Sequence, residues 1–278
     1  MIKDIVLHLS TGKGTRGTVD YAASIAVACG AHLAGVAFVL DPFVAPGMGV
    51  GDITPPSWID EQREQAQAAA DAAIAGFEEA ARRNALSAES RRLDASLAGA
   101  PTLFGEIARR FDLAIVRQAE AGRTPLEDLI IEAALFESSR PVLIVPYVQK
   151  EALGLERAMV CWDGSRTAAR AVGDAIPLLA RAKAVEVVTV LGDSGKSDEI
   201  AGADIAEHLA RHDLNVEIKR IPSIDGDVTD AILSHAADMG ADLLVMGGYG
   251  HSRLRQFILG GVTRDVLKTM TVPTFMSH

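Results

Sequence analysis

The sequence predicts an α/β protein built from two consecutive, doubly wound parallel sheets of five strands each. First, short apolar runs bounded by turn residues alternate with helical segments five times, and the alternation then starts again. Second, residues 111–116 (Phe-Asp-Leu-Ala-Ile-Val) resemble residues 241–246 (Ala-Asp-Leu-Leu-Val-Met), and the strand-like run after Pro141 resembles the run after Pro273. Such self-similarity indicates a tandem duplication. We expect domains at residues 1–148 and 155–278.

The first half contains five expected strands separated by four expected helices. The strands lie at residues 3–9, 32–40, 89–93, 113–116 and 141–146, and the helices at 19–29, 59–85, 102–110 and 126–138. Gly30 follows the first helix, where a glycine commonly ends a helix. Residues 41–57 are rich in glycine and proline, which predicts an exposed loop.

The second half repeats this order. The strands are expected at residues 158–162, 185–191, 216–221, 242–246 and 274–276, and the helices at 166–181, 200–212, 228–239 and 262–269. Pro177 lies inside the first of these helices and should kink or loosen it. Residues 192–198 are expected to form a loop.

Composition limits the classes of function. The 278 residues are 49% hydrophobic and 23% charged, with a formal net charge of −10, which indicates a globular chain and argues against binding nucleic acid or an anionic membrane. Cys29 and Cys161 fall in separate expected elements, so no disulfide framework is expected. No signal-peptide pattern or membrane-spanning run is visible, and a soluble cytoplasmic protein is expected.

In doubly wound sheets a ligand binds at the carboxyl ends of the strands, where the strand order reverses. In the second half the loops at this place carry Asp163 and the glycine-rich stretch that begins at Gly247. Glycines let backbone N–H groups approach an anion, and the start of a helix adds free N–H groups. Three cations lie nearby in sequence, namely Arg253, Arg255 and Arg264. An ordinary strand–loop–helix connection, with glycines needed only for turns, is the alternative.

Asp163 has two open roles. It follows the first strand of the second half, so its carboxylate can accept a hydrogen bond from a ribose or a base. It also precedes a helix, where aspartate is a common N-cap. The spacing leaves both roles open.

The glycine spacing is more specific. Gly247, Gly250 and Gly260 match the G-x-x-G-x9-G signature of the universal stress protein family, and the flanking strand, Asp163 and Val262-Thr263 match as well. The chain resembles this family through its whole second half, and through both halves in the pattern of elements. The resemblance implies an adenine-nucleotide alpha-hydrolase-like fold with strand order 3-2-1-4-5 in each half.

The resemblance also implies a ligand, ATP with or without Mg, and a set of binding residues. Asp163 and Val190 would border adenosine, and Met246 would lie beside the base. The ribose and phosphates would be contacted by Gly247, Tyr249, Gly250, Gly260, Gly261, Val262 and Thr263. It implies no catalytic residue and no protein metal ligand, and at most slow ATP hydrolysis. We expect a pseudo-dimer within one chain, an unidentified protein partner, and room for a homodimer.

One position departs from the family pattern. Members that bind ATP usually carry Ser, Thr or Asn directly after the last glycine, and this chain has Gly261. Glycine keeps the backbone donor but lacks a hydroxyl, which is worth about 0.5–1.5 kcal/mol as a neutral hydrogen bond. A structural or interaction module that binds no nucleotide therefore stays open as the competing class.

The first half lacks the signature. Residues 117–125 contain one glycine where the glycine loop should lie, and Leu9 or Ser10 stands where Asp163 lies in the second half. We interpret this half as a structural partner without a nucleotide site. The alternative is a site of different chemistry that uses Arg117 and Arg123.

Three other patterns carry less weight. Gly12, Gly14 and Gly17 form a literal G-x-G-x-x-G, with Asp41 at the end of the second strand, so an NAD-binding oxidoreductase is the third hypothesis. His208 and His212 share a helix face, but no Glu follows the first of them, and we expect two solvated histidines rather than a metal site. Cys161 is expected to be a small core residue, because the carboxylate of nearby Asp163 raises the pKa of a thiol.

Overall fold

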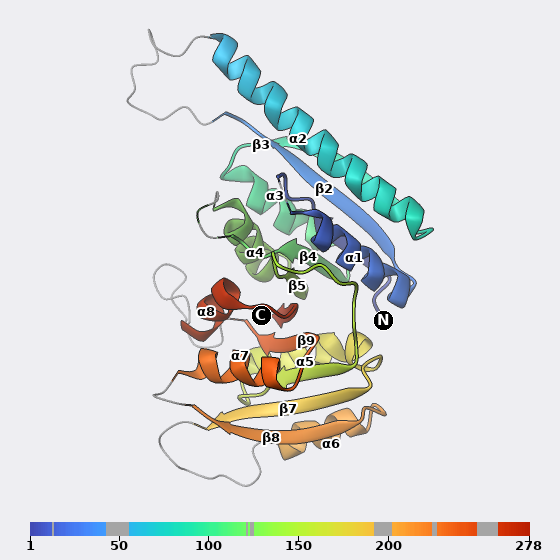
Figure 1. The fold of residues 1–278 in the computed structure, drawn as a ribbon, viewed down its shortest axis with the longest axis vertical. Helices are drawn as coiled ribbons and strands as arrows, with labels where there is room; N and C mark the ends of the chain where they lie inside the picture. The colour runs from blue at the N-terminus through green and yellow to red at the C-terminus, as the bar shows by residue number, and fades with distance from the viewer. Residues whose placement is uncertain are drawn as a thin grey trace.

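The computed structural model describes residues 1–12, 14–42, 56–120, 122, 125–191, 202–223, 227–248 and 261–278. Within these ranges the two halves have the same order of strands and helices (Figure 1). The first half consists of β1 (Asp4–His8), α1 (Arg16–Cys29), β2 (His32–Leu40), α2 (Pro56–Arg83), β3 (Ala88–Ala95), α3 (Gly99–Ala108), β4 (Leu113–Arg117), α4 (Leu126–Glu137) and β5 (Val142–Val145). The second consists of β6 (Arg157–Cys161), α5 (Arg166–Leu179), β7 (Ala184–Leu191), α6 (Ala203–Ala210), β8 (Val216–Pro222), α7 (Val228–Asp238), β9 (Leu243–Gly247), α8 (Gly261–Thr269) and β10 (Thr274–Ser277).

The strands form one continuous sheet in the order β3-β2-β1-β4-β5-β10-β9-β6-β7-β8. Each half is parallel and has the predicted order 3-2-1-4-5, so the fold class is confirmed. The two expected sheets are joined, however, because β5 and β10 pair antiparallel, with Phe275 opposite Leu143. All residues of both strands are buried. Pairing covers two apolar edges that would otherwise be exposed, and the chain forms an internal pseudo-dimer.

The repeat extends to individual hydrogen bonds. The Asp112 carboxylate accepts hydrogen bonds from the two amides at the start of β1, at 2.8 and 3.1 Å. The Asp242 carboxylate accepts the same pair of bonds at the start of β6, at 2.7 and 3.4 Å. Each half therefore uses one aspartate, placed just before its fourth strand, to fix the beginning of its first strand.

The same comparison assigns equivalent positions beyond the first strands. The amide of Leu9 donates to Val36 O at 2.8 Å, and the amide of Trp162 donates to Val188 O at the same distance. Leu9 therefore corresponds to Trp162, and Ser10 is the counterpart of Asp163. The alignment of β4 with β9 likewise makes Arg117 the counterpart of Gly247.

Helices cover both faces of the sheet. The core on one face contains side chains from α1, α2, α5 and α6, and the core on the other contains side chains from α3, α4, α7 and α8. None of the helices that the structure describes is long and apolar enough to cross a membrane. Both cysteines are free.

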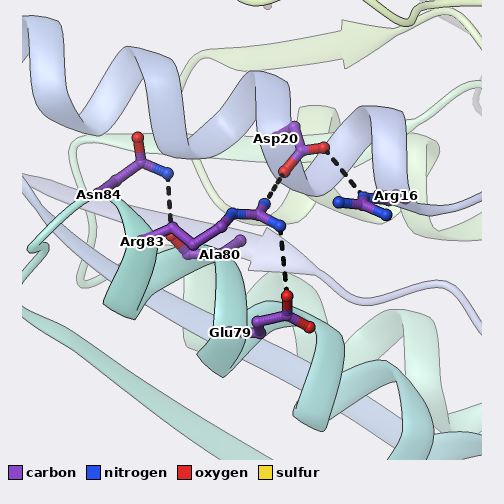
Figure 2. Close-up of polar contacts among 6 residues, drawn as sticks. All are labelled: Arg16, Asp20, Glu79, Ala80, Arg83 and Asn84. Carbon is purple, nitrogen blue, oxygen red and sulfur yellow. Dashed lines mark hydrogen bonds and ion pairs between the residues drawn. The ribbon is translucent and has the colours of Figure 1, made fainter.

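The long helix α2 extends past the rest of the first half at its N-terminal end (Figure 1). Its other end lies against α1, where Arg83 contacts Asp20 at 2.6 Å and Glu79 at 3.5 Å, and Arg16 contacts the same Asp20 at 3.5 Å (Figure 2). These ion pairs are partly exposed, so they orient the helix end more than they stabilise the fold. Most of the attachment comes from Ala70, Phe77 and other residues in the core.

Most predicted boundaries agree with the structure within a few residues. Gly30 ends α1 in the left-handed conformation, as expected. Pro177 lies inside α5, but the helix continues to Leu179. Residues 43–55 of the expected 41–57 loop lie outside the described residues, as does the expected 192–198 loop; α2 already begins at Pro56, a position that suits proline at a helix start.

Polar contacts also join the two halves. Gln118 is fully buried; its amide nitrogen donates to Leu267 O at 2.9 Å, and its amide oxygen accepts from the Tyr147 backbone at 3.2 Å. At another point of the contact between the halves, which we call the seam, Arg181 donates to Ala28 O at 3.1 Å. A residue between β4 and α4 thus holds α8, in the other half of the chain.

Candidate functional site

The strand order of the second half reverses at β6, which pairs with β7 on one side and with β9 on the other. Because Val160 pairs with Val245, the chain leaves β6 and β9 at nearly the same level of the sheet. β9 and β10 are parallel, so α8 must run back from the carboxyl edge of the sheet to its amino edge. The start of α8 therefore lies at the same edge as the ends of β6 and β9.

Asp163 lies at this edge and is exposed. One carboxylate oxygen, Oδ1, accepts a hydrogen bond from the Ser165 amide at 2.9 Å. The N-cap of α5 is Ser165 itself, whose hydroxyl accepts from the Ala168 amide at 3.1 Å. The capping role left open for Asp163 therefore belongs to Ser165, and the second oxygen of Asp163 has no hydrogen-bond partner among the described residues.

Gly247 ends β9 against the first turn of α5. A Cβ atom at this position would lie 2.6 Å from the Ala168 nitrogen and 2.7 Å from the hydroxyl oxygen of Thr167. Only glycine allows this close approach, so Gly247 has a packing role whatever else it contacts. At the next residue, the Gly248 amide donates to Ser277 O at 2.8 Å and is not available to an anion.

The start of α8 contains the last three predicted site residues. Gly261 is exposed, and among the described residues the nearest atom to a Cβ there would be Asp265 Oδ2, at 3.8 Å. Val262 is half-buried against the core and Thr263 is buried. The first turn has no acidic residue. The predicted Tyr249, Gly250 and Gly260, and the cations Arg253 and Arg255, lie outside the described residues.

Arg264, in the same turn, faces the first half of the chain. Burial and the charge of Asp128 raise the pKa of Glu132 on α4, and the charge of Arg264 acts in the opposite direction. The first turn of α8 therefore has its cation near the seam between the halves.

An apolar wall lies beside Asp163. Met246 is buried, and Val190 and Cys161 pack against the same core cluster on the face that α7 and α8 cover. Burial, with a further contribution from the charge of Asp163, raises the pKa of the Cys161 thiol to about 12. The thiol is therefore protonated at neutral pH, which agrees with its predicted role as a core residue.

The structure thus brings Asp163, Val190, Met246 and Gly247 to one edge of the sheet. Two residues there were not predicted: Thr167, whose hydroxyl lies 3.2 Å from that of Ser165, and His278, whose ring nitrogen lies 3.1 Å from Gly248 O. Ser165, the partner of Thr167, could have been found from the sequence, because a serine directly before a helix signals an N-cap. No local pattern signals that His278, directly after β10, reaches this edge.

The G-x-G-x-x-G pattern of the first half has a structural explanation. Gly12 and Gly14 have φ values of 126° and 83°, which favour glycine. A Cβ atom on Gly17 would lie 2.0 Å from the Gln149 carbonyl oxygen, in the segment that joins the halves. All three glycines are therefore required by the fold without a dinucleotide.

The histidines at the end of α6 and in the turn after it do not form a metal site with other described residues. The rings of His208 and His212 contact each other with centroids 4.9 Å apart, and both residues are exposed. Over the ranges that the structure describes, no group of three potential ligands is close enough to hold a metal ion.

Comparison with known proteins gives a consistent result. A sequence profile of the universal stress protein family matches residues 154–278. The universal stress protein Slr1230 of Synechocystis is 29% identical over 139 residues, which are 48% of this chain and 45% of that protein. The match therefore spans less than half the length of this relative.

Two solved structures match almost the whole chain. A universal stress protein from Archaeoglobus fulgidus superposes with a TM-score of 0.69 at 16% identity, over 99% of this chain and 95% of that one. A putative universal stress protein from Pseudomonas aeruginosa has a TM-score of 0.61 at 14% identity, over 99% and 93%. At these identities the likeness shows the fold of both halves.

Proposed function

The second half of this chain, residues 154–278, belongs to the universal stress protein family, and from this premise we propose that the chain binds an adenine nucleotide, ATP, in that half. One observation carries the proposal. The Asp163 carboxylate, with one oxygen free of described partners, lies at the same sheet edge as the start of α8, which has no acidic residue in its first turn. A hydrogen-bond acceptor and a helix N-terminus are what a nucleoside and its phosphates require at their two ends.

In this proposal each described residue has a defined role. Asp163 Oδ2 accepts a hydrogen bond from the ribose or the base, while Oδ1 stays bonded to Ser165. Met246 and Val190 form the apolar side of the adenine site. The backbone amides at the start of α8 and those of the glycine-rich stretch before it would bind the phosphates, with Mg as a counter-cation.

Binding would stabilise the second half by mass action, because a ligand that binds only the folded state shifts the folding equilibrium. The nucleotide would hold the loop after β6 and the start of α8 in one arrangement. A protein partner could then recognise that surface. No described residue is required as a catalyst, so the proposed activity is binding.

Isothermal titration of ligand-free protein with ATP, AMP and NAD tests the proposal. We expect ATP binding that is abolished by Gly250→Asp, because a carboxylate in the glycine-rich stretch would repel the phosphates. Gly173→Asp is the matched control: Gly173 is exposed on α5, and a Cβ atom there meets no described residue within 4 Å. Equal ATP affinity in the Gly250→Asp variant and in the control would overturn the proposal.

The departure at Gly261 supplies a second test. The backbone there is not in the left-handed region, and a Cβ atom has room, so serine fits. Gly261→Ser restores the hydroxyl of the family pattern and should raise ATP affinity by up to about tenfold. Unchanged affinity, measured by the same titration, would mean that this position does not contact phosphate.

A structural or interaction module without a nucleotide is the second candidate. The packing of Gly247 against α5 and the internal hydrogen bond of the Gly248 amide favour it, because both give the glycines a role in the fold. If protein freed of any co-purified ligand bound none of the nucleotides, that result would support this candidate. NAD binding that is lost in Gly14→Asp would instead support the oxidoreductase hypothesis.

A further inference from the structure

The first half has its own cleft at the point where its strand order reverses. β1 pairs with β2 on one side and β4 on the other, so the reversal lies at the carboxyl end of β1. The cleft there has about 250 Å³ of space, part of it open to solvent. The residues that line it and bear on its chemistry are His8, Ser10, Thr15, Thr18 and Arg117.

A buried cation lies in this cleft. Arg117 is 3% exposed, and its Nε has no hydrogen-bond partner. Its ion pair with Glu120 is long, at 3.5 Å from Nη2 to Oε2. Gly14, shortly before α1, lies close to the guanidinium, since a Cβ atom on it would be 3.5 Å from Arg117 Nη2. A buried guanidinium with five donors is costly unless anions or carbonyls accept its hydrogen bonds.

Two further polar side chains in the cleft also lack partners. His8 and Ser10 are 2% and 5% exposed, and neither His8 Nδ1 nor Ser10 Oγ makes a hydrogen bond. Burial lowers the pKa of His8 to about 4, so its ring is neutral at pH 7, and the ring packs against Phe38 and Phe104 at centroid distances of 5.9 and 5.6 Å. At the start of α1, Thr15 makes no capping hydrogen bond, and the first turn has no acidic residue. Unsatisfied buried groups of this kind are rare in native proteins and point to an unseen partner.

Comparison of the two halves shows that the charge of the site is inverted. Where the second half has Asp163 after its first strand, the first half has Ser10, and where the second half ends its fourth strand with Gly247, the first half has Arg117. The hydroxyl of Ser10 stands where the second half has a carboxylate, and the guanidinium of Arg117 stands where the second half has a glycine. The first half therefore has the donors that an anion needs, in a place where the second half has a carboxylate.

We propose that this cleft is a binding site for a small oxyanion, held by the Arg117 guanidinium and the Ser10 hydroxyl. Drug-sized ligands fill pockets of about 300–1,000 Å³, so this cleft is too small for a whole nucleotide. Its enclosed part has room for about one water molecule, enough for one oxygen of a phosphate or carboxylate that sits at the mouth. The bound anion competes with Glu120 for the guanidinium. The site does not depend on the proposed nucleotide site of the second half.

The test uses the whole chain and inorganic phosphate, with sulfate and acetate as second and third probes. Titration is carried out at constant ionic strength set with chloride. We expect saturable binding of at least one of the three anions. The anion with the highest affinity then identifies the class of ligand. Arg117→Gln should weaken it by about tenfold to a hundredfold, as expected for a hydrogen bond to a charged group.

Two variants keep the result interpretable. Arg110→Gln is the matched control, because Arg110 is exposed and its replacement removes the same charge from the same half of the chain. If Arg117→Gln does not fold, Ser10→Ala carries the test, with an expected loss of about twofold to tenfold. Binding should persist in Gly250→Asp, which separates this site from the nucleotide site. No saturable binding of any probe, or equal affinity in Arg117→Gln and the control, would overturn the proposal.

Discussion

The two glycines of the candidate site that the structure describes should respond in opposite ways to the same substitution. Gly247 and Gly261 belong to the same predicted binding motif, but their surroundings differ. A Cβ atom on Gly247 would lie 2.6 Å from the backbone nitrogen of Ala168. On Gly261 the nearest atom of the described residues, Asp265 Oδ2, would be 3.8 Å away. Replacing each by alanine therefore separates a glycine needed for packing from one that is not.

The magnitudes follow from these distances. Relief of the contact at Gly247 requires the first turn of α5 to move away, which disturbs the cap made by Ser165. Overpacking of this kind costs about 1–3 kcal/mol, and a lost N-cap costs about 1 kcal/mol. Gly261→Ala should be neutral or should stabilise by about 0.4–1 kcal/mol, since alanine reduces the entropy of the unfolded chain.

Equilibrium unfolding in urea, followed by circular dichroism, measures both effects on the whole chain. We expect a lower urea midpoint for Gly247→Ala and an equal or higher one for Gly261→Ala, with the slope of each transition unchanged. The nucleotide is left out, so that binding does not contribute. If Gly247→Ala is as stable as the wild-type chain, the close contact with α5 does not determine the residue at this position, and the packing argument is wrong.

Three further predictions concern the seam, His8 and Cys161. Gln118→Leu leaves the Leu267 carbonyl and the Tyr147 amide without their partner and should cost about 1–3 kcal/mol in urea unfolding; an unchanged midpoint would contradict this. Burial lowers the pKa of His8 from 6.5 to about 4, so the unfolded chain binds the proton first and stability falls as the pH drops from 6.5 to 4. Between pH 7.5 and 4.5, unfolding experiments should show that His8→Phe loses about 2–3 kcal/mol less than the wild-type chain, and equal losses would speak against it. With the pKa of its thiol raised to about 12, Cys161 should resist a thiol reagent at pH 8 in the native protein and react after unfolding, counted by mass spectrometry; rapid labelling of native Cys161 would refute the assignment.

Local pattern predicted nearly every element of this fold. The second strand, β2, has the predicted limits of residues 32–40, because Gly30 before the apolar run and the loop after it determine both ends. The duplication was also visible in the residues, since Asp112 and Asp242 precede matching apolar strands. The limits of the two domains, residues 1–148 and 155–278, stay a prediction.

The candidate site was predicted less completely. Spacing identified Asp163 and the glycine motif, but it left open whether Asp163 caps α5, and only the hydrogen bond of Ser165 answers that. A glycine in a sequence does not show whether a side chain would fit there, nor which neighbouring atoms would exclude it. At Gly247 that occupant is the start of α5, which approaches from a segment some 80 residues away.

The sequence by itself determined which segments are strands and helices, which faces are apolar and that the pattern occurs twice, because these properties depend on neighbours along the chain. Tertiary structure alone decided that β5 pairs with β10, that Gln118 joins the halves and that buried Arg117 lines the same cleft as Ser10. These contacts join residues more than 100 positions apart. Burial can be inferred from an apolar run, but the partner that buries it is selected by the shape and the hydrogen-bonding groups of surfaces that exist only after folding.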